Sequence, residues 1–441
     1  MRRVQGMEQA RLLLRRGDPL DALQGTPQLR EGIRSTFGEP LSPVDVVERI
    51  IKGVRSGGDS AVIDYTRTIS GIRLTSLEVS RGLIEAAPSC VSQDLLTALS
   101  TAAERITRYH EATKVPAGIH FVDKELGQKC VPLQRVGLYV PGGRYAYPSS
   151  VLMSAIPARV AGVEEVSVIT PPGPDGNVAA VTLAACHIAG VDRVFAAGGA
   201  QAIAALAYGT ESVPRVDKIC GPGNVFVTIA KRMVFGSVAI DSLAGPSEVL
   251  IIADSSASAA YCAADLLAQA EHDPDARVAL VTTSSEFADA VEAEVCRQVG
   301  SLERKGQIEE ALDSAIIATV ESLDCALELT NEFAPEHLEL LISEPASALE
   351  RIRNAGCICL GGQSPVVMGD YIDGPSHVLP TGGAARFSSV LGVHDFMKYS
   401  SVAQLSDGTM SSLGPAAITI ARAEGLEAHA RAVEVRLNKA D

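Results

Sequence analysis

The feature that most constrains this fold is a repeated alternation of short apolar strands, turns rich in glycine or proline, and helices. The alternation recurs at a spacing of about 28 residues from Val136 onward, as expected for a parallel sheet with crossover helices. Eight apolar segments fit buried strands: 136–140, 166–170, 194–197, 249–253, 278–282, 316–320, 338–342 and 357–360. We therefore expect an α/β protein with two incomplete Rossmann-like parallel-sheet domains and helical extensions at both termini.

The positions of these segments predict how the 441 residues divide into domains. We expect four parts: an amino-terminal helical extension (1–33), a discontinuous α/β domain (34–138 and 248–391), a Rossmann-like domain (139–247) and a carboxyl-terminal helical extension (392–441). Either Met1 or Met7 serves as a start, and the sequence leaves that choice open.

Charge and cysteine content exclude several classes of protein. With 38 Lys and Arg against 53 Asp and Glu, the net charge is −15, so neither nucleic acid nor an anionic membrane surface is an expected partner. No apolar run approaches the roughly 20 residues that span a bilayer. The nine cysteines contain no CxxC pair, and Cys357-x-Cys359 comes nearest. We expect reduced thiols in a cytoplasmic protein.

Two short motifs combine imidazole with other polar groups. Gln269 and His272 lie three residues apart and share one face of a helix, from which both reach a single divalent ion. A cap or dipole partner at the helix end is the more usual role of such a histidine. Glu336 and His337 directly precede an apolar strand, where they suit proton transfer at a sheet edge or, equally well, an exposed polar turn.

Two further regions carry histidines outside these motifs. The glycine-rich loop 369–381 contains Asp370, a hard oxygen donor, and His377, and it suits either ligand binding or a surface turn. His429 lies in a terminal helical segment after Glu424, where a histidine usually faces solvent.

Three glycine turns bear on nucleotide binding. Tyr139 precedes Gly142-Gly143, Gln201 follows Gly198-Gly199, and Asn224 ends Gly221-Pro222-Gly223-Asn224. None matches GxGxxG or a phosphate loop. The turn pattern alone leaves dinucleotide binding and ordinary βα turns equally open.

Taken together, nine segments resemble the histidinol dehydrogenase family in order and spacing, from about residue 40 to 438. They are VGLYVPGGR, VLMSAIPARVAGV, GGAQAIAALAYGTESVP, VDKICGPGN, AGPSEVLIIAD, LLAQAEHDPDA, APEHLEL, GDYIDGPSHVLPT and EGLEAHARAVEVR. The resemblance implies an enzyme that oxidises L-histidinol through the aldehyde to L-histidine, with two NAD, one water and one zinc ion per subunit.

The resemblance also implies roles for individual residues. The zinc ligands would be Gln269, His272, Asp370 and His429, all of which would also lie at the substrate. Glu336 and His337 would form the acid–base pair, His337 taking the alcohol proton and Glu336 activating water. The other substrate contacts implied are Ser247, His377 and Glu424, and the NAD contacts implied are Tyr139, Gln201 and Asn224. His429 would enter the site from the partner subunit of a homodimer.

Two departures from the family pattern lie near the implied substrate. Ser242-Leu243 stands where the family usually has Met-Pro, and Ser376 replaces a frequent Asn. A related enzyme acting on another polar alcohol, such as a sulfonated diol, is the nearest alternative. A catalytically silent zinc-binding scaffold and a zinc hydrolase are alternatives from other classes, and a hydrolase gives no reason for the glycine turns.

Overall fold

The computed structural model describes residues 1–17, 25–143 and 145–438 and divides the chain into two compact units. The first unit comprises Met1–Lys114 and Leu133–Phe396, and the second comprises Val115–Pro132 and Met397–Asp441. Residues 18–24 of the expected amino-terminal extension lie outside the described part of the chain. No helix among the described residues is long and apolar enough to cross a membrane.

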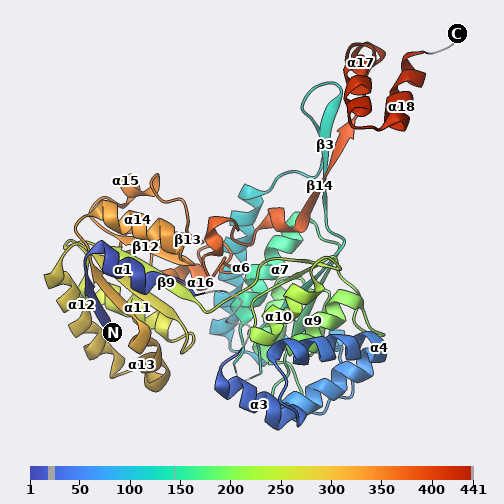
Figure 1. Ribbon diagram of the computed structural model, residues 1–441. Helices are drawn as coiled ribbons and strands as arrows, with labels where there is room; N and C mark the ends of the chain where they lie inside the picture. Colours follow the sequence, from blue (N-terminus) through green and yellow to red (C-terminus); the bar gives the residue numbers. More distant parts are fainter. Residues whose placement is uncertain (18–24, 144, 439–441) are drawn as a thin grey trace. The chain divides into compact units, whose positions relative to one another are not determined.

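The first unit contains two parallel sheets (Figure 1), which confirms the expected fold class. The five-stranded sheet has the order β6-β5-β4-β7-β8. Its strands are β4 (Arg135–Tyr139), β5 (Glu165–Thr170), β6 (Arg193–Ala196), β7 (Lys218–Cys220) and β8 (Ala239–Ile240). The six-stranded sheet has the order β1-β11-β10-β9-β12-β13. Its strands are β1 (Arg2–Gln5), β9 (Glu248–Ala253), β10 (Arg277–Thr282), β11 (Ile316–Thr319), β12 (His337–Leu341) and β13 (Cys357–Leu360).

Helices pack on both faces of the five-stranded sheet. One face carries α3 (Pro27–Phe37), α4 (Pro43–Ser70), α9 (Gly199–Tyr208) and α10 (Val225–Val234). The other carries α6 (Gln93–Thr113), α7 (Pro148–Ala161) and α8 (Ala180–Ile188), with the short helices α5 (Arg81–Ala86) and η1 (Ala87–Cys90) against α8. Successive side chains of β4, β5 and β6 point to opposite faces of the sheet and are buried on both, because helices cover each face.

The six-stranded sheet is also covered on both faces (Figure 1). On one side lie α11 (Ala259–Ala270), α12 (Ser285–Val299) and α13 (Lys305–Ser314). On the other side lie α1 (Met7–Leu14), α14 (Leu323–Phe333) and α15 (Pro345–Leu349). After β13 the chain forms α16 (Val366–Tyr371), η2 (Ala384–Arg386) and η3 (Val393–Phe396).

The grouping of residues 34–138 differs from the expected domain organisation. We expected this segment to join 248–391 in one domain, but α4 packs against α9 and α10 of the five-stranded sheet. Apolar residues on α4 such as Val47 and Ile50 share a core with Phe195 and Ile203. The amino-terminal extension also differs, because Arg2–Gln5 forms a strand that pairs with β11.

The second unit is a three-stranded antiparallel sheet followed by two helices. The sheet consists of β2 (Gly118–Phe121), β3 (Leu126–Pro132) and β14 (Met397–Ala403), in the order β14-β3-β2. The helices are α17 (Asp407–Ala423) and α18 (Glu427–Leu437), which separate at Gly425, a residue with φ +75°. The expected helical extension from 392 therefore contains the short helix η3 and the strand β14 before its two long helices.

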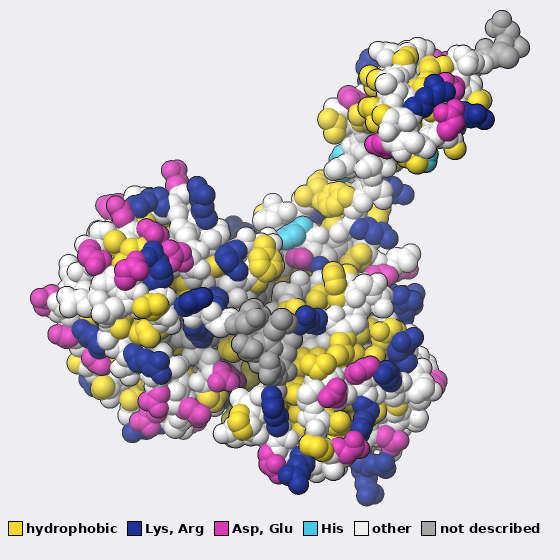
Figure 2. Space-filling view, in the orientation of Figure 1, with side chains coloured by type: hydrophobic (Ala, Val, Ile, Leu, Met, Phe, Trp, Pro, Cys, Tyr) yellow, Lys and Arg dark blue, Asp and Glu magenta, His cyan; other side chains and the backbone are white. Residues whose placement is uncertain are grey.

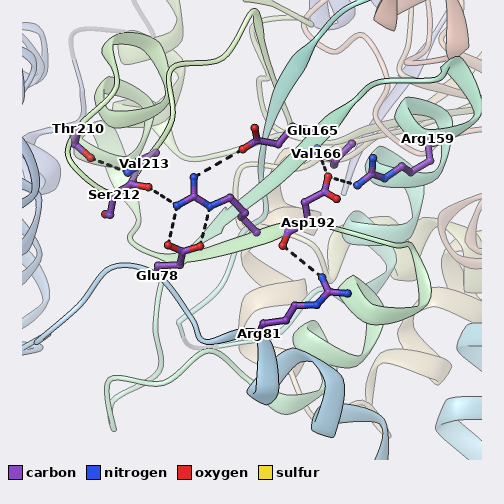
Figure 3. Close-up of polar contacts among 10 residues, drawn as sticks. Glu78, Arg81, Arg159, Glu165, Val166, Asp192, Thr210, Ser212 and Val213 are labelled. Atoms are coloured by element: carbon purple, nitrogen blue, oxygen red, sulfur yellow. Dashed lines mark hydrogen bonds and ion pairs between the residues drawn. The ribbon is translucent and has the colours of Figure 1, made fainter.

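Polar contacts strengthen the amino edge of the five-stranded sheet (Figure 3). Arg193, at the start of β6, donates to both carboxylate oxygens of Glu78 at 2.8 and 2.7 Å, a bidentate pair. Asp192 accepts a hydrogen bond from the backbone of Val166 at 2.7 Å and pairs with Arg159. These contacts tie β5, β6 and the segment before α5 together, and they leave the opposite, carboxyl edge of the sheet open for a ligand.

Candidate functional site

Two adjoining cavities lie at the strand ends of the first unit. The larger cavity has a volume of about 1030 Å³, and residues from the ends of both sheets line it. The smaller cavity, of about 860 Å³, lies at the carboxyl ends of β4 and β6. Pro141, Gly223 and Asn224 line both cavities, so a ligand in one reaches the boundary of the other.

The five-stranded sheet presents its carboxyl edge to these cavities. The strand order runs outward from β4 in one direction and from β7 in the other, and a crevice opens at such a switch point. Tyr139 ends β4, and the turn 221–224 follows β7. Gly221 has φ +113°, and a Cβ atom there would overlap the Tyr139 carbonyl oxygen. Glycine is thus required for this turn to lie against β4.

The six-stranded sheet presents its amino edge instead. Ser247 directly precedes β9, Glu336 directly precedes β12, and His337 is the first residue of β12. Because α11 connects the parallel strands β9 and β10, its carboxyl end returns to the same edge and brings Gln269 and His272 there. All five side chains line the larger cavity.

Glu336 is a buried carboxyl group with an altered proton affinity. The residue is 6% exposed, and its Oε2 accepts a hydrogen bond from the backbone N–H of Glu248 at 2.7 Å. Glu248 is itself held by Arg16, whose Nη2 donates to Oε2 at 2.7 Å. Burial raises the pKa of Glu336 to about 7, although the neighbouring His337 opposes this change. Glu336 can therefore exchange a proton near neutral pH.

His337 lies beside Glu336 in the cavity wall. Its Nδ1 is buried and has no hydrogen-bond partner within residues 1–17, 25–143 and 145–438. Burial by itself lowers the pKa of His337, but a hydrogen bond with Cys357 and the charges of Glu336 and Asp370 raise it to about 9. An unpaired ring nitrogen and an adjacent carboxyl suit transfer of a proton to or from a ligand.

Three predicted metal ligands converge on the larger cavity. His272 Nε2 lies 3.9 Å from Asp370 Oδ2, and Gln269, 3% exposed, has a buried Nε2 without a partner in the described chain. The described residues contain no cluster of three or more His, Cys, Asp or Glu side chains that could hold a metal. An amide oxygen, an imidazole and a carboxylate are donor types that a zinc ion accepts.

His377 and Ser247 complete the predicted residues of this cavity. His377 Nδ1 lies 2.8 Å from the carbonyl oxygen of Asp370. Because a carbonyl only accepts, Nδ1 carries the proton and donates, which leaves Nε2 of the neutral ring as an acceptor. Burial lowers the pKa of His377, which favours that neutral form.

The other two predicted site residues belong to the second unit. Glu424 directly follows α17 and His429 lies on α18, and both are exposed. The larger cavity is lined by residues of the first unit.

All three predicted NAD contacts line the smaller cavity. The Tyr139 hydroxyl accepts a hydrogen bond from Gly199 N at 3.2 Å, and Gln201 has a buried Oε1 without a partner among the described residues. Asn224 caps α10 by accepting from Phe226 N at 3.1 Å. The lining of this cavity is mostly apolar and contains glycine turns whose backbone lies open to a ligand.

The sequence did not reveal one buried pair that supports both cavities. Lys231 and Asp241, 2% and 5% exposed at their side chains, form an ion pair. Asp241 also accepts from the backbone of Gly221 and Ser242, each at 2.7 Å, and so joins the 221–224 turn to the loop before Ser247. The sequence signal that could have revealed this pair is a lysine within an apolar helix, followed by an aspartate in the next loop.

The two departures from the family pattern have different surroundings. Ser242 lines the larger cavity, whereas Leu243 is exposed and is not part of its lining. Ser376 is buried, and its hydroxyl donates to the Met153 carbonyl oxygen at 3.0 Å rather than facing the cavity.

Comparisons with known proteins identify the family of this chain. The family model of histidinol dehydrogenase matches residues 40–437. Histidinol dehydrogenase from Dehalococcoides mccartyi strain 195 is 52% identical over 90% of this chain and 91% of its own length. The Methanosarcina mazei enzyme is 49% identical over 90% and 93%. The crystal structure of histidinol dehydrogenase from Elizabethkingia anophelis superimposes with a TM-score of 0.90 at 33% identity, covering 99% of this chain and 98% of that one. The chain belongs to the histidinol dehydrogenase family.

Proposed function

We propose that this protein oxidises L-histidinol through L-histidinal to L-histidine, with two NAD and one water, in the last steps of histidine biosynthesis. One observation carries the proposal: a single cavity joins an acid–base pair to three metal donors and adjoins a second cavity lined by glycine turns. Two successive hydride transfers from one carbon require a substrate held in one place beside the nicotinamide.

NAD would occupy the smaller cavity and accept a hydride in each oxidation. Tyr139, Gln201 and Asn224 would contact it, and the N–H groups of the glycine turns suit its pyrophosphate. Because Pro141, Gly223 and Asn224 also line the larger cavity, the reactive end of NAD would lie at this boundary.

A zinc ion would be held by Gln269, His272 and Asp370, with His429 from the partner subunit as the fourth ligand. Bound zinc would orient the substrate, the template role of a catalytic metal. Ser247, His377 and Glu424 would complete the substrate contacts. The neutral His377 ring supports this arrangement.

Glu336 and His337 would move the protons. His337 would take the alcohol proton in the first oxidation, and Glu336 would take a proton from the water that hydrates the aldehyde. His337 would then assist the second oxidation. Asp370 contributes to the raised pKa of His337, so a cation held on that carboxylate would lower this pKa and favour the neutral ring that acts as a base.

The second unit supports a homodimer in which His429 crosses between subunits. Leu413 and Ile420 on α17 and Val435 on α18 are 58%, 59% and 73% exposed, and hydrophobic side chains are visible on this unit in Figure 2. Exposed apolar side chains in such number favour a covering partner. Mixing His429→Ala with Glu336→Ala subunits should restore activity, and verified heterodimers without activity would refute the exchange.

The partners and location follow the same reasoning. On the face in Figure 2, basic and acidic side chains of the first unit are interspersed, which does not suit nucleic acid. The nine cysteines are free thiols, which supports a cytoplasmic location.

The deciding experiment counts NADH formed per histidinol consumed. We expect two, lost on chelation and restored by zinc, whereas sulfonated diols should give none. His337→Ala should reduce turnover by about 10²–10⁴-fold while zinc stays bound. His187→Ala, at an exposed position on α8, is the control. Near-normal turnover of His337→Ala would reject its assigned role.

A further inference from the structure

Glu339 is a carboxyl group within an apolar layer. Along β12, Leu338 and Leu340 face the core under α14, so Glu339 faces the opposite core, which contains Ile251 and Leu266. Glu339 is 0% exposed. A carboxyl group at such a position requires hydrogen-bond partners, because burial without them is strongly unfavourable.

Each oxygen of Glu339 has a different environment. Oε1 accepts a hydrogen bond from the backbone N–H of Val366 at 2.8 Å, at the start of α16. Oε2 is buried, and no N–H or O–H group of the described chain donates to it. The carboxyl group of Asp265, on α11, lies within hydrogen-bonding reach of Glu339. Two ionised carboxylates only accept, so this contact becomes a hydrogen bond only when one of them is protonated.

The surrounding groups favour one proton on the pair. The titratable groups that face it are Cys262 on α11, Cys359 on β13 and His337 on β12 itself. Burial raises the pKa of Cys262, and a hydrogen bond with Cys357 together with burial raises that of Cys359, so both thiols stay neutral. Burial also raises the pKa of both Glu339 and Asp265, although the charge of His337 opposes the change at Glu339. The pair therefore retains a shared proton near neutral pH.

The pair joins three elements that carry the site. Asp265 precedes Gln269 by one turn of α11, Val366 begins the helix that carries Asp370, and Glu339 lies two residues after His337 on the same face of β12. We propose that Asp265 and Glu339 are positioning residues that share one proton and thereby hold α11, α16 and β12 in the arrangement that binds the metal. This inference rests on the metal site of the proposed function.

Two substitutions of similar size at Glu339 test this role. Glu339→Gln retains an acceptor for Val366 N and supplies N–H groups to Asp265, whereas Glu339→Leu removes both hydrogen bonds. Zinc affinity of the full-length protein is measured by competition with a chromogenic chelator at pH 7. We expect Glu339→Leu to weaken zinc binding by about 10–100-fold, as for other outer partners of metal ligands, and Glu339→Gln to retain most of the affinity. Asp265→Asn should behave like Glu339→Gln.

The pH dependence separates positioning from a merely structural role. As the pH rises from 7 to 9.5 the wild-type pair loses its shared proton, so its zinc affinity should fall more steeply than that of Glu339→Gln. Equal slopes, or wild-type affinity in Glu339→Leu, would overturn the proposal. If circular dichroism shows that Glu339→Leu does not fold, the change of zinc affinity with pH in wild type and in Glu339→Gln still tests the proposal.

An infrared measurement tests the shared proton without zinc. At pH 7 the metal-free wild type should show a protonated-carboxyl carbonyl band that both Glu339→Gln and Asp265→Asn lack. If both variants keep this band, the shared proton is refuted. Zinc affinity unchanged by Asp370→Asn would instead refute the proposed metal site, while the infrared result would still decide the state of the pair.

Discussion

Replacing Glu336 by Gln should make stability less sensitive to pH. In the folded protein Glu336 is 6% exposed, and burial raises its pKa from 4.5 to about 7. Between these two values the unfolded chain is ionised at this position while the folded protein keeps the proton. Stability therefore falls as pH rises from 4.5 to 7, because the folded state binds the extra proton. Gln does not titrate, so Glu336→Gln lacks this decline.

The size of the effect follows from the two pKa values. A tenfold change in proton affinity is about 1.4 kcal/mol, so the difference between 4.5 and about 7 corresponds to about 3 kcal/mol. Gln can preserve the bond from Glu248 N, which is 2.7 Å in the wild type. Relative to wild type, Glu336→Gln should thus gain about 3 kcal/mol between pH 4.5 and pH 8, while its conversion of the aldehyde is lost.

Urea unfolding with a chelator present measures this difference. Wild type and Glu336→Gln are titrated at several pH values from 4.5 to 8, and the difference in free energy of unfolding is plotted against pH. Glu303→Gln, at an exposed position, is the matched control. A difference for Glu336→Gln that stays flat, or that declines with pH, would show that burial does not hold the proton on this carboxyl.

Three other substitutions test the supports of the cavities. Lys231→Met should reduce the free energy of unfolding by about 3–5 kcal/mol in urea titrations, because it leaves Asp241 charged and buried; a loss below 1 kcal/mol would contradict this. Gly221→Ala should reduce the free energy of unfolding by about 1–3 kcal/mol and weaken NAD binding in calorimetry. Residue 221 has φ +113°, and the added Cβ atom would overlap the carbonyl oxygen of Tyr139. Gln201→Leu should leave stability unchanged or slightly higher, since its Oε1 has no partner among the described residues, yet weaken NAD binding; unchanged NAD affinity would remove Gln201 from the site.

Most of the strands that sequence patterns predicted have two buried faces. β5 and β10 are mostly apolar and are buried after their first residue, because helices cover both sides. The strands that were not predicted are short or polar, such as β8 with two residues and β1 with the sequence RRVQ. Pairing with a distant strand forms β1, and no local pattern records that partner.

The candidate site was predictable as a set of residue types but not as a place. Gln269 and His272 suggested a shared helix face, and Glu336-His337 suggested proton transfer, yet each motif alone had an ordinary explanation. Only their resemblance to one family joined them before the structure was known. The Lys231–Asp241 pair and the Asp265–Glu339 pair had no sequence signal of comparable strength.

The amino-acid sequence by itself determined the alternation of strands and helices and the chemical groups available for catalysis, because both depend on neighbouring residues. Tertiary structure alone decided that one sheet offers its carboxyl edge and the other its amino edge, and that α4 joins the five-stranded sheet. It also decided the proton affinities of Glu336 and Glu339, because these depend on burial by segments far away in the chain.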